Sequence, residues 1–194
     1  MVGMNSTSFL LVLLNFVIIG AVPLMTMRRG RLTPGLVLTL APLVVAPILV
    51  VVAWAGVLSV DQTRLPAVRE VLLTVAALSS ITLVAYTAGT HRIPLSLWHQ
   101  RDDAPVEIVS WGPYRRVRHP FYASYLLALV AAALLIPSWP SIVVLVIGAV
   151  ALDLTARREE RRLLASGLGA EYAAYRQQTG RFIPRWWSAR RSVA

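Results

Sequence analysis

The sequence contains no cysteine and no lysine. The absence of cysteine excludes disulfides, thiolate metal sites, cysteine nucleophiles and S-palmitoylation. All 19 basic residues are therefore arginines, and against nine acidic residues they give a net charge of +10. A soluble chain this basic would suggest nucleic-acid binding, but it has no recognition helix and no platform of aromatic and basic residues. The arginines instead flank apolar runs, which predicts positive-inside topology and contact with membrane lipid rather than nucleic acid.

Charge of either sign is scarce, because only 14% of the 194 residues are charged and 57% are hydrophobic. A water-soluble domain of this length needs more polar surface than that. Five apolar runs predict an all-α polytopic membrane protein with about five transmembrane helices in a single domain, 1–194. The predicted spans are 8–27, 34–60, 66–90, 121–136 and 141–155, and the turn at 137–140 makes the last two a helical hairpin.

The distribution of arginine predicts the orientation. Arg28 and its neighbours follow the first run, so this run is interpreted as a retained helix with its N-terminus outside rather than as a cleaved signal peptide. With five spans, every arginine except Arg64 and Arg69 then lies on the cytoplasmic side. The predicted C-terminal amphipathic helix, 156–178, also lies there. Exclusive use of arginine is typical of a GC-rich bacterial genome, so we expect the bacterial inner membrane.

Two cytoplasmic segments carry residues suited to chemistry. In the first, Gly112 to Tyr122, Pro120 is expected at the first helical position with His119 just outside it. A helix N-terminus with arginines upstream, Arg118 among them, suits a carboxylate, and Tyr122 adds a hydroxyl and an aromatic face.

In the second segment, Glu159 and Glu160 follow the fifth span and could hold an amino group or ribose hydroxyls. Local ion pairs, Arg157 with Glu160 and Glu159 with Arg162, explain them equally well.

The ordered set of motifs resembles one family. Five motifs follow one another between Gly112 and Pro184: Gly-Pro-Tyr-Arg, Arg-His-Pro-x-Tyr, Glu-Glu with two leucines, Gly-x-Glu-Tyr-x-x-Tyr and Arg-x-x-Pro. This pattern is similar to that of the isoprenylcysteine carboxyl methyltransferases and phospholipid methyltransferases. The resemblance implies an integral membrane enzyme that uses S-adenosylmethionine, with three N-terminal spans in 1–90 and the cofactor-binding and catalytic half in 91–194.

The resemblance also implies roles for individual residues. Glu160, His119 and Arg181 are the candidate catalytic residues. The cofactor is expected to contact His119, Pro120, Tyr122, Arg118, Glu159 and Glu160, and the spacing leaves open which glutamate is the functional carboxylate. No metal is expected. His91 and His99 lie in the polar connection between the third and fourth spans and have no assigned role.

The acceptor stays open at this stage. A lipophilic carboxylate, phenol or amine would each suit a membrane enzyme, and only an acceptor that carries a proton needs a base, for which His119 or Glu160 is the candidate. Two other functions stay open: an NADPH-dependent sterol-type membrane reductase and a non-enzymatic membrane scaffold. A soluble methyltransferase fold is excluded, because the only Gly-x-Gly, Gly167-Leu168-Gly169, follows helical residues rather than a strand and lacks the third glycine.

Overall fold

A computed structural model describes residues 5–26, 34–58, 67–90 and 107–185 of the chain. These residues form helices and no strand, which confirms the predicted all-α class. The elements are α1 (Ser6–Thr26), α2 (Pro34–Trp54), α3 (Ala67–Thr90), the 3-10 turn η1 (Gly112–Arg115), α4 (Pro120–Leu135), α5 (Trp139–Leu164) and α6 (Gly169–Gln178).

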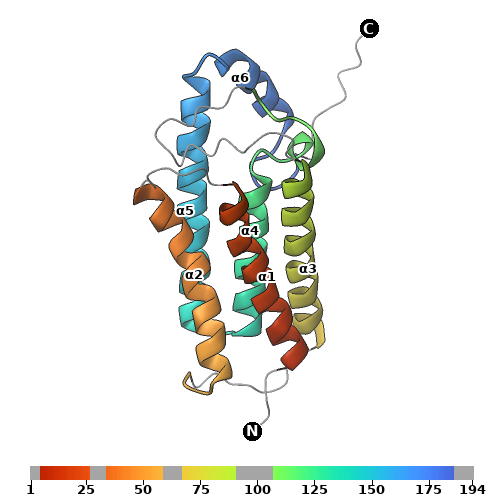
Figure 1. The fold of residues 1–194 in the computed structure, drawn as a ribbon, viewed down its shortest axis with the longest axis vertical. Coiled ribbons are helices and arrows are strands. Elements are labelled where there is room, and N and C mark those ends of the chain that lie inside the picture. The colour runs from red at the N-terminus through yellow and green to blue at the C-terminus, as the bar shows by residue number, and fades with distance from the viewer. Residues whose placement is uncertain (1–4, 27–33, 59–66, 91–106, 186–194) are drawn as a thin grey trace.

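The long helices run up and down along the long axis of the molecule (Figure 1). The start of α4, the end of α5 and the whole of α6 therefore meet at one end of the bundle, which we call the α6 end. Both motif segments predicted to carry chemistry lie there, whereas the turn between α4 and α5 lies at the opposite end.

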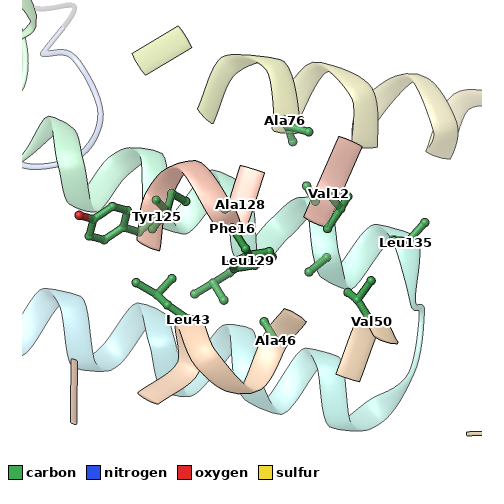
Figure 2. Packing of buried hydrophobic residues seen from close by; sticks show 14 of the residues in the cluster. Val12, Phe16, Leu43, Ala46, Val50, Ala76, Tyr125, Ala128, Leu129 and Leu135 are labelled. Carbon is green, nitrogen blue, oxygen red and sulfur yellow. The ribbon is translucent and has the colours of Figure 1, made fainter. Parts of the chain in front are cut away.

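Helix α4 is the centre of the bundle. It packs against α1, α2, α3 and α5, and Figure 2 shows its Ala128 and Leu129 between side chains of α1 and α2. Small residues allow this close approach: Gly148 of α5 lies so near Leu129 that an added Cβ would come within 2.5 Å of its Cδ1. The packing fixes the position of the first turn of α4 and of the motif that precedes it.

The outer faces of the bundle are apolar. Large exposed side chains such as Leu14, Val75 and Ile147 lie on different helices. Among the described residues, α3 and α5 are long and apolar enough to cross a membrane, and three shorter apolar stretches occur at Ser6–Ala21, Thr39–Trp54 and Pro120–Leu135.

Two predicted helix boundaries were wrong. Helix α2 passes through Pro42 and Pro47 but ends at Trp54 instead of residue 60, and Gly56 follows it with φ 74°.

The predicted separate helix 156–178 is instead divided between two elements. Residues up to Leu164 continue α5 without a break, and α6 begins at Gly169. The carbonyl oxygen of Leu164 would lie 2.4 Å from a Cβ at Gly169, so the break brings the two backbones too close for a side chain. Glu159 and Glu160 thus belong to the last turns of α5.

A buried polar group joins three helices inside the bundle. Ser80 of α3, which is fully buried, donates a hydrogen bond to the carbonyl oxygen of Ser124 in α4 at 2.7 Å. The same hydroxyl lies 3.0 Å from Oδ1 of Asn15 in α1, which is also fully buried. Polar contacts of this kind fix how apolar helices are rotated against one another.

Candidate active site

The candidate site is built on a short backbone pairing between its two halves. Val117 and Gly180 form an isolated parallel bridge. The amide of Arg118 donates to the carbonyl of Gly180 at 2.8 Å, and the amide of His119 donates to that of Arg181 at 3.1 Å. The Arg-His-Pro motif and the Gly-Arg motif, about sixty residues apart in sequence, are therefore neighbours with their side chains on one side of α5.

Glycines make this approach possible. A Cβ at Gly180 would lie 1.8 Å from the carbonyl oxygen of Ile183, which no side chain tolerates. Gly112 has φ 59° and lies against the side chain of Thr90, so it combines a left-handed backbone with a close contact. The η1 turn is thereby held against the end of α3, where Trp111 Nε1 also donates to the Thr90 carbonyl at 3.2 Å.

Helix α6 is fastened over the same end. The hydroxyl of Tyr175 donates to the carbonyl of Tyr114 at 2.7 Å, and Tyr172 is only 3% exposed. Arg118 donates to the carbonyl of Thr179, just after α6. The two tyrosines of the Tyr-x-x-Tyr motif thus hold α6 over the site, a role that sequence reasoning did not assign to them.

Glu160 is the centre of the charged cluster, and its side chain is 4% exposed. Arg118 Nε donates to its Oε1 at 3.0 Å. Arg181 donates to both oxygens, Nε to Oε1 at 3.1 Å and Nη2 to Oε2 at 3.0 Å, and reaches Oδ1 of Asp153 through Nη1 at 2.7 Å. Asp153 and Glu160 are seven residues apart, which is about two helical turns, so both carboxylates lie on one face of α5. The guanidinium of Arg181 can therefore bond to both.

His119 lies between the two glutamates. Its Nδ1 is 3.5 Å from Oε2 of Glu159, and its Nε2 is 3.3 Å from Oε1 of Glu160. Tyr122 donates to Oε1 of Glu159 at 2.7 Å. The rings of His119 and Tyr122 are parallel within 1° and 5.3 Å apart, so a histidine, a tyrosine and two carboxylates face one another across α4 and α5.

Burial sets the protonation of His119. It lowers the pKa of this imidazole below 6.5, and the nearby guanidinium groups of Arg118 and Arg181 lower it further, while the Glu160 carboxylate opposes the shift. His119 is therefore neutral at pH 7. For Arg181, hydrogen bonding to Glu160 raises the pKa, so this guanidinium stays charged.

Two buried polar atoms in this cluster make no hydrogen bond with any of the described residues. They are Nε2 of His119, whose contact with Glu160 does not have hydrogen-bond geometry, and the hydroxyl of Tyr172. Burial raises the pKa of the Tyr172 hydroxyl, and the Glu160 carboxylate raises it further. Buried polar atoms are rarely left without a partner in folded proteins, so these two are suited to a polar ligand.

The structure thus brings together six predicted residues: Arg118, His119, Tyr122, Glu159, Glu160 and Arg181. Pro120 is at the first position of α4 and His119 at its N-cap, as predicted. The alternative that Glu160 pairs locally with Arg157 was wrong, since Arg157 pairs with Asp153 and Glu160 with Arg118 and Arg181. His91 and His99 lie outside the described residues.

Sequence reasoning missed Asp153, and it assigned no role in the site to Tyr172, which it had noted as part of a motif. Asp153 lies inside an apolar run, and a charge in such a run is itself a signal of function or pairing. Within the described residues, no group of three or more His, Cys, Asp or Glu side chains could hold a metal ion.

Comparison with known families identifies the chain. The family model for phospholipid methyltransferases matches residues 71–171, just over half of the sequence, from α3 into α6. The chain belongs to the phospholipid methyltransferase family. No curated protein and no solved structure matches it. Membership implies a membrane methyltransferase, and with the apolar helices α3 and α5 it indicates an integral membrane protein.

Proposed function

We propose that the protein transfers a methyl group from S-adenosylmethionine to a lipophilic acceptor in the membrane. The observation that carries this proposal is the enclosed cluster of His119, Tyr122 and Glu159 beside Glu160 and its two arginines. The chain's family supports methyl transfer, and the chemistry of the cluster supports this donor.

The residues present fit the donor's groups. The carboxylates of Glu159 and Glu160 suit an ammonium group or ribose hydroxyls, and the unpartnered atoms of His119 and Tyr172 supply further hydrogen-bonding positions. Arg118 and Arg181 suit a carboxylate. The face of the Tyr122 ring suits a sulfonium cation.

The reaction makes one bond and breaks one. S-adenosylmethionine supplies an electrophilic methyl group; its carbon–sulfur bond breaks as the bond to the acceptor's nucleophile forms, and S-adenosylhomocysteine leaves. The protein's contribution is to orient both reactants and to exclude water around them. If the acceptor carries a proton, His119 is the candidate base, because its lowered pKa keeps the imidazole neutral and its Nε2 makes no hydrogen bond within the described residues.

The proposal extends to topology. We propose that α1 to α5 all cross the membrane, that the α6 end faces the cytoplasm and that the membrane is the bacterial inner one. The soluble donor then arrives from the cytoplasm and the lipophilic acceptor from the bilayer. Cysteine accessibility tests this, since the chain has none of its own: a cysteine introduced at exposed Glu171 should react with an impermeant reagent only from the cytoplasmic side.

Calorimetry on the purified protein separates the proposed function from its alternatives. S-adenosylhomocysteine should bind, and NADPH should not. Binding of NADPH alone would support a membrane reductase, and binding of neither would support a scaffold.

Substitutions then test the site. Glu160→Ala and His119→Ala should weaken S-adenosylhomocysteine binding, whereas Glu171→Ala, on the exposed side of α6, should not. Unchanged affinity in the first two variants would refute the site.

A further inference from the structure

One face of α4 is open while the rest of the helix is buried. We call Leu126, Leu127, Val130 and Leu134 the α4 stripe, since these apolar side chains are partly exposed. Ala133 is the only other residue of α4 that is not buried. Spacings of three and four residues place the four stripe residues on one face of the helix.

The neighbours of α4 explain this opening. Helix α3 packs against α1, α1 against α2, and α2 against α5, so the four form an arc with α4 inside it. Within the described residues, α3 and α5 form no comparable interface with each other. The arc is therefore open between α3 and α5.

Hydrogen bonds show that the stripe faces this opening. Tyr122 is bonded to Glu159 of α5, and the carbonyl of Ser124 accepts a bond from Ser80 of α3. Ala123, between them in sequence, therefore points between α5 and α3, because successive side chains of a helix are about 100° apart. The stripe residues follow Ala123 at positions +3, +4, +7 and +11, on the same face.

The stripe begins one turn beyond Tyr122 and runs toward the opposite end of the bundle. At its site end Ala123 is only 7% exposed, so the face is covered next to the charged cluster and open farther along. On the other side of α4, helices α1 and α2 are packed over it (Figure 2). The open face of α4 between α3 and α5 thus leads from the lipid-facing side of the bundle toward Tyr122, which lies one turn before the stripe.

We infer that the α4 stripe holds the hydrocarbon chain of the methyl acceptor, with the acceptor's reactive end at Tyr122 and His119. This inference rests on the proposed function and adds the place and direction of acceptor binding. An apolar chain in the opening contacts leucine and valine side chains, while its polar end meets the enclosed cluster. A second copy of the protein fits less well, because α4 lies inside the arc formed by α1, α2, α3 and α5.

The first test fills the opening. Leu126→Trp and Val130→Trp should lower transfer of labelled methyl groups from S-adenosylmethionine into a total bacterial lipid extract by about tenfold or more, the scale of overpacking in a fitted apolar site. S-adenosylhomocysteine affinity should stay within about twofold, which also shows that the variants fold. Leu14→Trp, on the exposed face of α1, is the matched control and should transfer at the wild-type rate. Equal activity of the stripe variants and this control would overturn the inference.

The second test does not depend on activity. A long-chain fatty acid with a diazirine at its chain end is irradiated with the full-length protein and S-adenosylhomocysteine in detergent, and labelled peptides are mapped. Label should concentrate on residues 126–134 and decrease in Val130→Trp and when lipid extract is added. Label spread evenly over the outer faces of α1, α2 and α5, or a dimer that Val130→Trp dissociates without loss of activity, would contradict the inference. Failure of the wild-type protein to bind S-adenosylhomocysteine would instead count against the proposed function alone.

Discussion

Tyr122 of α4 donates a hydrogen bond of 2.7 Å to Glu159 of α5, joining the first turn of one hairpin helix to the last turns of the other. Both groups are largely shielded from water: Tyr122 is 7% exposed and the Glu159 side chain 15%. The bond orients Glu159, which leaves its second oxygen toward His119.

Tyr122→Phe should therefore weaken both the protein and the site. A buried carboxylate that loses a donor costs about 1–3 kcal/mol, and Glu159 loses the bond that orients it. We expect a lower unfolding temperature and weaker S-adenosylhomocysteine binding by calorimetry. Tyr125→Phe, on the same helix and equally buried, is the control for loss of a hydroxyl. Identical behaviour of the two variants would show that the bond to Glu159 has no special role.

Arg181→Lys should reduce cofactor affinity although it keeps the charge. Arg181 donates to both oxygens of Glu160 and to Asp153, and a lysine ammonium cannot reproduce that planar fork. Arg185→Lys serves as the control, since Arg185 is exposed and donates only to the Gln177 carbonyl among the bonds described. The measurement is the dissociation constant of S-adenosylhomocysteine, and wild-type affinity in Arg181→Lys would argue against a role for the fork.

The sequence allowed most of the helices and most of the site to be predicted, for different physical reasons. Long apolar runs predict helices directly, because a helix that crosses a membrane mainly needs sufficient length and hydrophobicity. His119 could be placed at the start of α4 because Pro120 restricts the residue before it. The gathering of Arg118, His119 and Glu160 was expected only from resemblance to a family.

What could not be predicted depends on contacts distant in sequence. Local spacing suggested that Arg157 pairs with Glu160, but Arg118 and Arg181 reach Glu160 from 42 and 21 residues away. Nothing in the local pattern reveals that the backbone of Gly180 accepts a hydrogen bond from the amide of Arg118. The α4 stripe could not be predicted either, because the sequence of α4 is apolar on every face. Only the helices that pack against α4 show which of its faces is left open.

Gly180→Ala should disrupt the site more than the substitution of an exposed residue does. The added Cβ would overlap the Ile183 carbonyl oxygen, so the backbone that holds Arg118 and His119 must move. We expect loss of S-adenosylhomocysteine binding with the helical circular dichroism signal retained. Gly167→Ala is the matched control, because no atom of the described residues outside its own chain neighbours lies within 4 Å of its added Cβ. Wild-type binding in Gly180→Ala would mean that the pairing of the two motifs is dispensable.

The lowered pKa of His119 makes stability depend on pH. Below about pH 6.5 the unfolded chain binds a proton at this imidazole, whereas the folded protein does not, so stability falls as pH falls from that value. His119→Gln removes this contribution. The unfolding temperature of the wild type should therefore drop more steeply than that of the variant between about pH 7.5 and 5.5. Parallel curves for the two proteins would falsify the assignment of a buried neutral imidazole.

Ser80→Ala tests whether the polar contacts inside the bundle position the site. The variant removes the donor to the Ser124 carbonyl and the contact with Asn15, and such bonds between membrane helices are worth about 0.6 kcal/mol on average and up to about 1.7. We expect the free energy of reversible unfolding in detergent to fall by this amount. S-adenosylhomocysteine binding should also weaken, because Ser124 lies two residues from Tyr122. Ser80→Thr keeps the hydroxyl and should recover part of both. Thr87→Val is the control on the same helix: Thr87 is fully buried, but its hydroxyl donates to the Leu83 carbonyl of α3 itself. If Ser80→Ala lowers stability but leaves ligand affinity at the level of Thr87→Val, the contacts hold the helices together without orienting the active-site end of α4.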